Sequence, residues 1–112
     1  MSYEISVHKD FLAEAKKLKK RYHSFSDDLE DFKNSLQENP FQGTELTPGI
    51  RKIRMAIASK GRGKAGSARV ITANAIIAEN EGRIALLTIY DKQDAATVKL
   101  NIIKKMAQEL GF

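Results

Sequence analysis

Residues 59–72 read SKGRGKAGSARVIT, and this stretch decides between two very different folds. Its three glycines have the G-x-G-x-x-G spacing of dinucleotide-binding loops, which lie between a strand and the N-terminus of a helix. Here residues 67–72, SARVIT, have the composition of a strand, so no helix follows the glycines. A P-loop is also excluded, because Gly63-Lys64 is followed by Ala65 where Ser or Thr would hold Mg²⁺. The stretch therefore predicts a loop between two strands of a sheet, and no cofactor site.

The strand before this loop has two chemically different faces. Ile53, Met55 and Ile57 recur with a period of two, which is typical of a strand with one face against a core. Lys52 and Arg54 alternate with them and therefore point the other way. The sequence thus predicts two positive charges on the sheet face opposite the core.

Three further segments are predicted as strands. Residues 68–77, ARVITANAII, and residues 83–90, RIALLTIY, are rich in branched apolar residues, and a turn at residues 80–82 makes them a hairpin. The alternating residues Tyr3, Ile5 and Val7 predict a short first strand. We expect this strand to join the same antiparallel sheet.

Helical spacing of apolar residues predicts three helices, which complete an α+β fold in the order β-α-α-β-β-β-α. They lie at residues 9–22, 27–38 and 94–110, the last with a buried stripe of Val98, Ile102, Ile103, Met106 and Leu110. Residues 41–49, FQGTELTPG, are predicted as a loop. We expect one domain over residues 1–112, in which the first two helices cover one face of the sheet.

Positive charge is concentrated in one part of the chain. The net charge is +5, yet no acidic residue lies between Glu45 and Glu79, and this window carries seven Lys and Arg residues. Such a concentration indicates a polyanionic partner, either nucleic acid or an acidic protein segment. The alternative interpretation is a solvated loop between charged strands.

Composition also bounds the site and its setting. The chain has no cysteine, which excludes disulfides and thiolate zinc sites. His8 and His23 lie far in sequence from the basic strands, so we expect surface or packing roles and no metal site. No apolar run is long enough to span a bilayer, and the N-terminus lacks the pattern of a signal peptide. The expected location is the cytoplasm, without a membrane partner.

Two segments of the chain together resemble a known family. Residues 49–71, GIRKIRMAIASKGRGKAGSARVI, and residues 86–92, LLTIYDK, resemble the RelE superfamily of bacterial toxins, and most closely its HigB-like branch. Residues 38–46, ENPFQGTEL, resemble the family's loop between helix and sheet. The resemblance covers essentially the whole chain and implies a twisted antiparallel sheet packed against helices.

The resemblance also implies a function. Members of this superfamily enter the ribosomal A site, cut mRNA there without a metal, and are neutralised by a cognate antitoxin. The partners implied are therefore an antitoxin protein, the ribosome and mRNA. The catalytic candidates carried over are Lys52, Arg54, Arg69, Tyr90 and Lys92, and the RNA-binding candidates are Lys60, Arg62 and Lys64.

These residue types suit RNA cleavage by the 2′-hydroxyl of the substrate. The reaction needs a base for the hydroxyl, charge stabilisation at the phosphorus and an acid for the leaving oxygen. Arginines can stabilise the charge, and a lysine among like charges is neutral more readily and can act as a base. Tyr90 closes an apolar strand and suits a core role equally well, while Asp91 suits a cap for the turn into the last helix.

The same residues bear on two other functions. A double-stranded RNA-binding module needs a basic start to its last helix, whereas residues 91–96 read DKQDAA. A catalytically degenerate RelE-like domain, which binds only an acidic antitoxin or RNA, is compatible with everything in the sequence.

Overall fold

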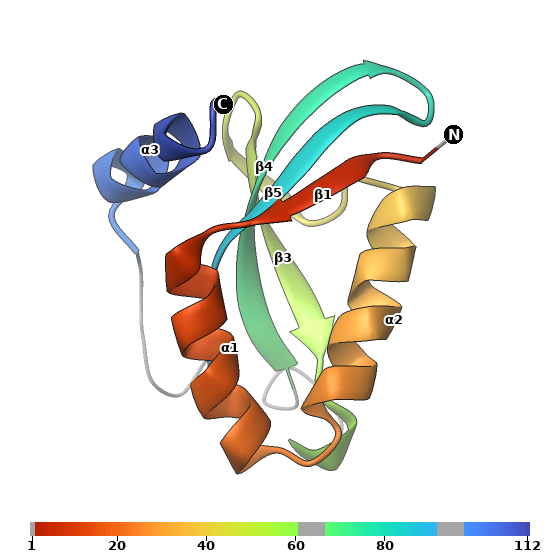
Figure 1. Cartoon of the computed structure of the whole chain (residues 1–112), viewed down its shortest axis with the longest axis vertical. Helices are drawn as coiled ribbons and strands as arrows, with labels where there is room; N and C mark the ends of the chain where they lie inside the picture. The colour runs from red at the N-terminus through yellow and green to blue at the C-terminus, as the bar shows by residue number, and fades with distance from the viewer. Residues whose placement is uncertain (1, 61–66, 92–97) are drawn as a thin grey trace.

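The computed structural model of the protein describes residues 2–60, 67–91 and 98–112, and it contains one five-stranded sheet with helices on both faces (Figure 1). In chain order the elements are β1 (Glu4–Val7), α1 (Lys9–Arg21), α2 (Phe25–Glu38), β2 (Thr44–Thr47), β3 (Ile50–Ala56), the 3₁₀ turn η1 (Ala58–Lys60), β4 (Ser67–Ala78), β5 (Glu81–Asp91) and α3 (Leu100–Glu109). The predicted α+β class is confirmed. None of the helices within the described ranges is long and apolar enough to cross a membrane.

The strand order is β1-β5-β4-β3-β2, and one pairing differs from the prediction. The pairs β2–β3, β3–β4 and β4–β5 are antiparallel, whereas β1 lies parallel to β5. The expectation of a wholly antiparallel sheet is therefore wrong for β1. The physical reason is the connection, because α1 and α2 carry the chain from β1 to the opposite edge before β2 begins. The chain then reverses its direction three times, from β2 to β3, β4 and β5, so that β5 runs beside β1 in the same direction.

The edge strand β2 lies within the segment that was predicted as a loop, residues 41–49. Thr44 pairs with Lys52 of β3, and the register shifts between Glu45 and Thr47. Three of the four β2 residues are exposed, so the segment has no alternating burial that a sequence could display. The strand forms because its backbone pairs with β3, and not because its side chains favour a core.

The first face of the sheet packs against α1 and α2. Phe11 of α1 and Leu36 of α2 are fully buried in the same apolar cluster as Ile53 and Met55 of β3. The predicted alternation of β3 and the coverage of one face by these two helices are thus confirmed. In the view of Figure 1, α1 lies to the left and α2 to the right across this face, with α3 apart from both.

The second face of the sheet is covered in part by α3, whose Ile103 and Met106 are buried against β3, β4 and β5. Ile102, predicted to be buried, is 50% exposed because it lies on the outer side of the helix. The last helix was predicted to begin at residue 94, and this is wrong for residues 98 and 99, which are not helical. The helix α3 begins at Leu100. Residues 94–97 lie outside the described residues. Coverage of both faces explains why the strands of the hairpin are nearly continuous apolar runs.

Candidate nucleic-acid interface

Three of the predicted site residues lie in one row across the sheet. In the antiparallel register Arg54 of β3 is paired with Arg69 of β4, and Arg69 is paired with Tyr90 of β5. Directly paired residues of neighbouring strands point to the same face and are separated by about 5 Å. The row lies on the second face, because Arg54 alternates with Ile53 and Met55 of the first core. The sheet thus brings together residues that are up to 36 positions apart in the chain.

Lys52 lies beside this row, and a cavity joins it to the two arginines. It is two residues before Arg54 on β3 and therefore on the same face. A cavity of about 400 Å³ is lined by Lys52, Arg54 and Arg69 and by residues 42–44, which lead into β2. We call Lys52, Arg54 and Arg69 the cationic patch. Gln42 and Thr44 were missed by the sequence analysis, because their approach to the patch depends on β2.

Gly43 holds that segment against the patch. Its φ of +75° is in the region that favours glycine, and a Cβ placed on it would collide with the carbonyl oxygen of Lys52. Arg51 adds two hydrogen bonds from its side chain, donating to the carbonyl oxygens of Gln42 at 2.8 Å and Gly43 at 3.2 Å. The wall of the cavity is therefore fixed by close backbone packing at Gly43 and by the hydrogen bonds of Arg51.

The cationic patch is not neutralised by the described part of the chain. Within it, neither Lys52 nor Arg54 has an ion-pair partner, and no acidic residue lines the cavity. Arg69 donates from Nη1 to Ser67 Oγ at 2.7 Å, which orients its guanidinium without cancelling the charge. Positive charges without an acidic neighbour attract phosphate groups, so this cavity is a candidate site for them.

Tyr90 contributes a phenol that stays protonated at neutral pH. Burial raises the pKa of the Tyr90 phenol above its ordinary value of 10.0, and the positive charge of Arg69 offsets part of that rise. The ring packs against the core cluster that includes α3, which supports the core role considered for Tyr90. A protonated phenol can donate a hydrogen bond or a proton, but it does not accept one readily as a base.

Lys60 was expected to project from the glycine loop, and for this residue the structure corrects the expectation. Its side chain is only 4% exposed, and Nζ lies 2.6 Å from Oδ1 of Asp91.

Asp91 is fully buried and also accepts hydrogen bonds from Tyr22 Oη at 2.5 Å and Arg21 Nη1 at 3.2 Å. The buried carboxylate of Asp91 is thus the centre of a polar network, and the turn that Asp91 was predicted to cap lies outside the described residues. The partners of Asp91 are 31 to 70 residues away in the chain, beyond the reach of local sequence patterns.

Three other predicted site residues, Arg62, Lys64 and Lys92, lie outside the described residues. The two histidines do not line the cavity. His8 is buried and caps α1, accepting from the backbone N–H of Asp10 through Nδ1 while Nε2 lies 3.2 Å from Glu109 Oε1. His23 is exposed.

Comparison with known proteins supports the fold and not the chemistry. The chain matches no protein-family model. It is similar to a solved structure of the E. coli toxin RelE in the free state, a mutant with two arginines changed to alanine. The TM-score is 0.59 over 98% of each chain, with 14% sequence identity. The RelE-like fold expected from the sequence is thereby confirmed.

Proposed function

We propose that the protein is a ribosome-dependent endoribonuclease toxin that cuts mRNA in the ribosomal A site and is neutralised by a cognate antitoxin. The observation that carries this proposal is the row of Arg54, Arg69 and Tyr90 beside Lys52. The RelE-like fold and the resemblance of residues 49–71 to the HigB-like branch of that superfamily also support it. The proposed setting is the cytoplasm, where ribosomes and mRNA are available.

The proposed reaction uses the substrate's own 2′-hydroxyl. Its oxygen attacks the adjacent phosphorus, the bond to the 5′-oxygen of the next nucleotide breaks, and the products are a 2′,3′-cyclic phosphate and a 5′-hydroxyl end. Arg54 and Arg69 stabilise the extra negative charge on the phosphate oxygens. Lys52 is the residue of the patch placed to take the 2′-proton, and Tyr90 gives its phenolic proton to the leaving 5′-oxygen. No metal is needed, because the arginines supply the charge.

One observation favours a second candidate function, a degenerate domain that binds RNA or an acidic antitoxin without cutting. In the described part of the chain, no carboxylate or imidazole lines the cavity beside the cationic patch. These are the groups that most often serve as bases near neutral pH. The two candidates differ in whether mRNA ends appear, so a cleavage assay separates them.

The test is induction of the protein in a bacterial host, with mapping of mRNA 5′ ends and measurement of growth. We expect growth arrest and new mRNA ends within codons. Arg69→Ala should lower cleavage by about a hundredfold or more, because it removes a charge-stabilising donor. Lys20→Ala is the matched control, since Lys20 is an exposed cation of α1, which packs on the opposite face of the sheet.

A folded wild-type protein that binds programmed ribosomes without producing new ends would favour the degenerate domain. Cleavage by Arg69→Ala at the wild-type rate, at equal abundance, would show that the cationic patch is not the site.

A further inference from the structure

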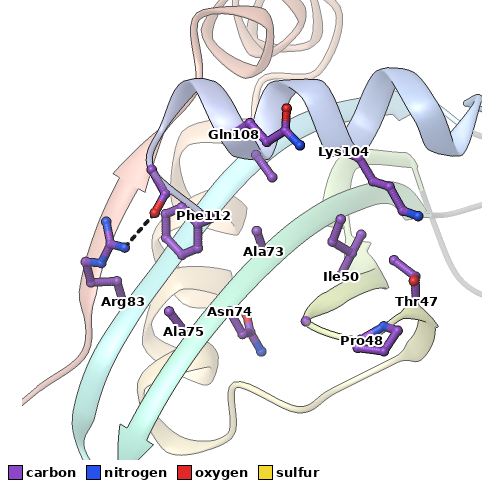
Figure 2. A pocket seen from close by; sticks show the side chains of 13 residues that line it. Thr47, Pro48, Ile50, Ala73, Asn74, Ala75, Arg83, Lys104, Gln108 and Phe112 are labelled. Atoms are coloured by element: carbon purple, nitrogen blue, oxygen red, sulfur yellow. Dashed lines mark hydrogen bonds between the residues drawn. The ribbon is translucent and has the colours of Figure 1, made fainter.

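A second cavity, of about 590 Å³, lies between α3, the β2–β3 turn and the sheet. Figure 2 shows α3 above it, the strands as its floor, and Thr47 and Pro48 at one end. Phe112 and Arg83 bound the other end, where the guanidinium carbon of Arg83 lies 4.4 Å from the ring centroid of Phe112. Arg83 also donates to the carbonyl oxygen of Gly111 at 2.9 Å, which holds the C-terminal residues in place. The volume is within the range of pockets that bind small organic groups.

This cavity lies next to the cationic patch on the same face of the sheet. Ile50 forms part of its floor, and the next residues of β3 that point to this face are Lys52 and Arg54. The strand rise places Ile50 roughly 13 Å from Arg54 along β3. A nucleic acid strand with one phosphate at the patch therefore has a neighbouring nucleotide within reach of the cavity.

The lining has the chemistry of a nucleobase site. Ile50 and Ala73 provide an apolar floor, and Phe112 provides an aromatic ring of the kind on which bases stack. Gln108 of α3 also lines the cavity, and its amide can both donate and accept hydrogen bonds. Among the residues that the structure describes, none that lines this cavity is acidic, while Lys104 and Arg83 carry positive charge at its ends. A purely apolar peptide would leave the Gln108 amide without hydrogen-bond partners, and an acidic peptide segment would leave the Phe112 ring without a stacking partner. An RNA strand can use both groups.

We infer that the second cavity binds one base of the RNA strand whose phosphate lies at the cationic patch, and that it sets a base preference at that position. This inference rests on the proposed function, since the patch must first hold RNA. Phe112 supplies stacking and Gln108 supplies the hydrogen bonds that distinguish one base from another.

The test measures co-sedimentation of the whole protein with ribosomes programmed by 2′-O-methyl mRNA, which cannot be cut. One nucleotide at a time around the A-site codon is replaced by an abasic nucleotide, which keeps the phosphates. We expect one abasic position to weaken binding of the wild-type protein by about tenfold. In Phe112→Leu and Gln108→Ala the intact mRNA should bind about as weakly, and the abasic replacement should then cost little more.

Asn101→Ala is the matched control, because Asn101 is an exposed amide of α3 that does not line the cavity. It should keep the full abasic penalty. Gln108 and Asn101 are both exposed, so neither substitution should change the thermal unfolding midpoint appreciably.

The outcomes separate this inference from the proposed function. Binding that depends on Arg54 and Arg69 but is unaffected by every abasic replacement overturns the base site and leaves the function standing. The same holds if the abasic penalty persists in both cavity variants, or if these variants lose only the capture of an antitoxin. Absence of both ribosome binding and mRNA cleavage in the wild-type protein overturns the proposed function, and the base site with it.

Discussion

At the scale of single residues, Tyr90 combines two environments. Its ring packs against a core, and it is paired with Arg69 in the sheet register. The sequence favoured neither the core role nor the site role of Tyr90, and the two roles are compatible in the structure, where the ring is packed and the phenol is near Arg69. Burial of the ring is what raises the pKa of the Tyr90 phenol, so packing on the core also fixes the protonation state that the proposed acid requires. The same coupling makes Tyr90 open to a direct test.

Tyr90 is expected to ionise above pH 10, as measured by the phenolate absorbance of the wild-type protein minus that of Tyr90→Phe. Arg69→Ala should move the transition to still higher pH, because it removes the positive charge that lowers the pKa of Tyr90. Since the folded pKa of Tyr90 is raised, its protonated form stabilises the fold below pH 10, and this contribution is lost as the pH rises further. A phenolate signal from Tyr90 near pH 8 would contradict this assignment.

Asp91 gives a second prediction at this scale. Asp91→Asn leaves the buried Lys60 ammonium, and the Arg21 guanidinium beside it, without their carboxylate. The free energy of unfolding should fall by about 3–5 kcal/mol, as measured by urea denaturation. Asp31→Asn, at an exposed position of α2, is the control and should change it by less than about 0.5 kcal/mol. Equal effects of the two substitutions would mean that the buried network contributes nothing specific.

At the scale of elements, what could be predicted from the sequence follows the strength of each local pattern. The alternation in β3 and the apolar runs of β4 and β5 predicted these strands within a few residues, and with them the shared face of Lys52 and Arg54. β2 has no such pattern, because it is an exposed edge that forms by backbone pairing. The side of the sheet that α3 covers, and the network around Asp91, depend on residues far apart in the chain.

The edge strand β2 can be tested through its two flanking glycines. Gly43→Ala should lower the free energy of unfolding by about 2 kcal/mol or more, because positive φ and a collision with the Lys52 carbonyl act together. Gly49→Ala has a similar φ of +83°, but its Cβ would meet only Asn74 O at 3.4 Å. It should therefore cost about 1 kcal/mol. Urea denaturation of both variants measures the difference, and a larger loss for Gly49→Ala would contradict the packing described for Gly43.

At the scale of the whole molecule, the two faces of the sheet differ in how they are covered. Its first face is covered by α1 and α2 over a continuous core, while its second face is covered only in part by α3. The part that α3 leaves open carries the cationic patch. The acid-free window between Glu45 and Glu79 contains β3 and β4, so antiparallel pairing of these two strands concentrates charges that are dispersed in the sequence. The basic segment thus becomes a compact patch of positive charge on one face of the sheet, which is where we propose that RNA binds.

This concentration of charge predicts the salt dependence of ribosome or RNA binding. Each phosphate contact that is lost lowers the slope of log K against log salt concentration by about 0.7 for a single strand, because fewer counterions are released. The double variant Lys52→Ala/Arg54→Ala should therefore bind more weakly at low salt, with a slope shallower by about 1.4. Lys19→Ala/Lys20→Ala removes the same charge from exposed positions of α1 and should leave the slope nearly unchanged if RNA is held on the second face. Equal changes of slope in both double variants would mean that the whole basic surface attracts RNA, and that the patch formed by β3 and β4 has no special part in binding.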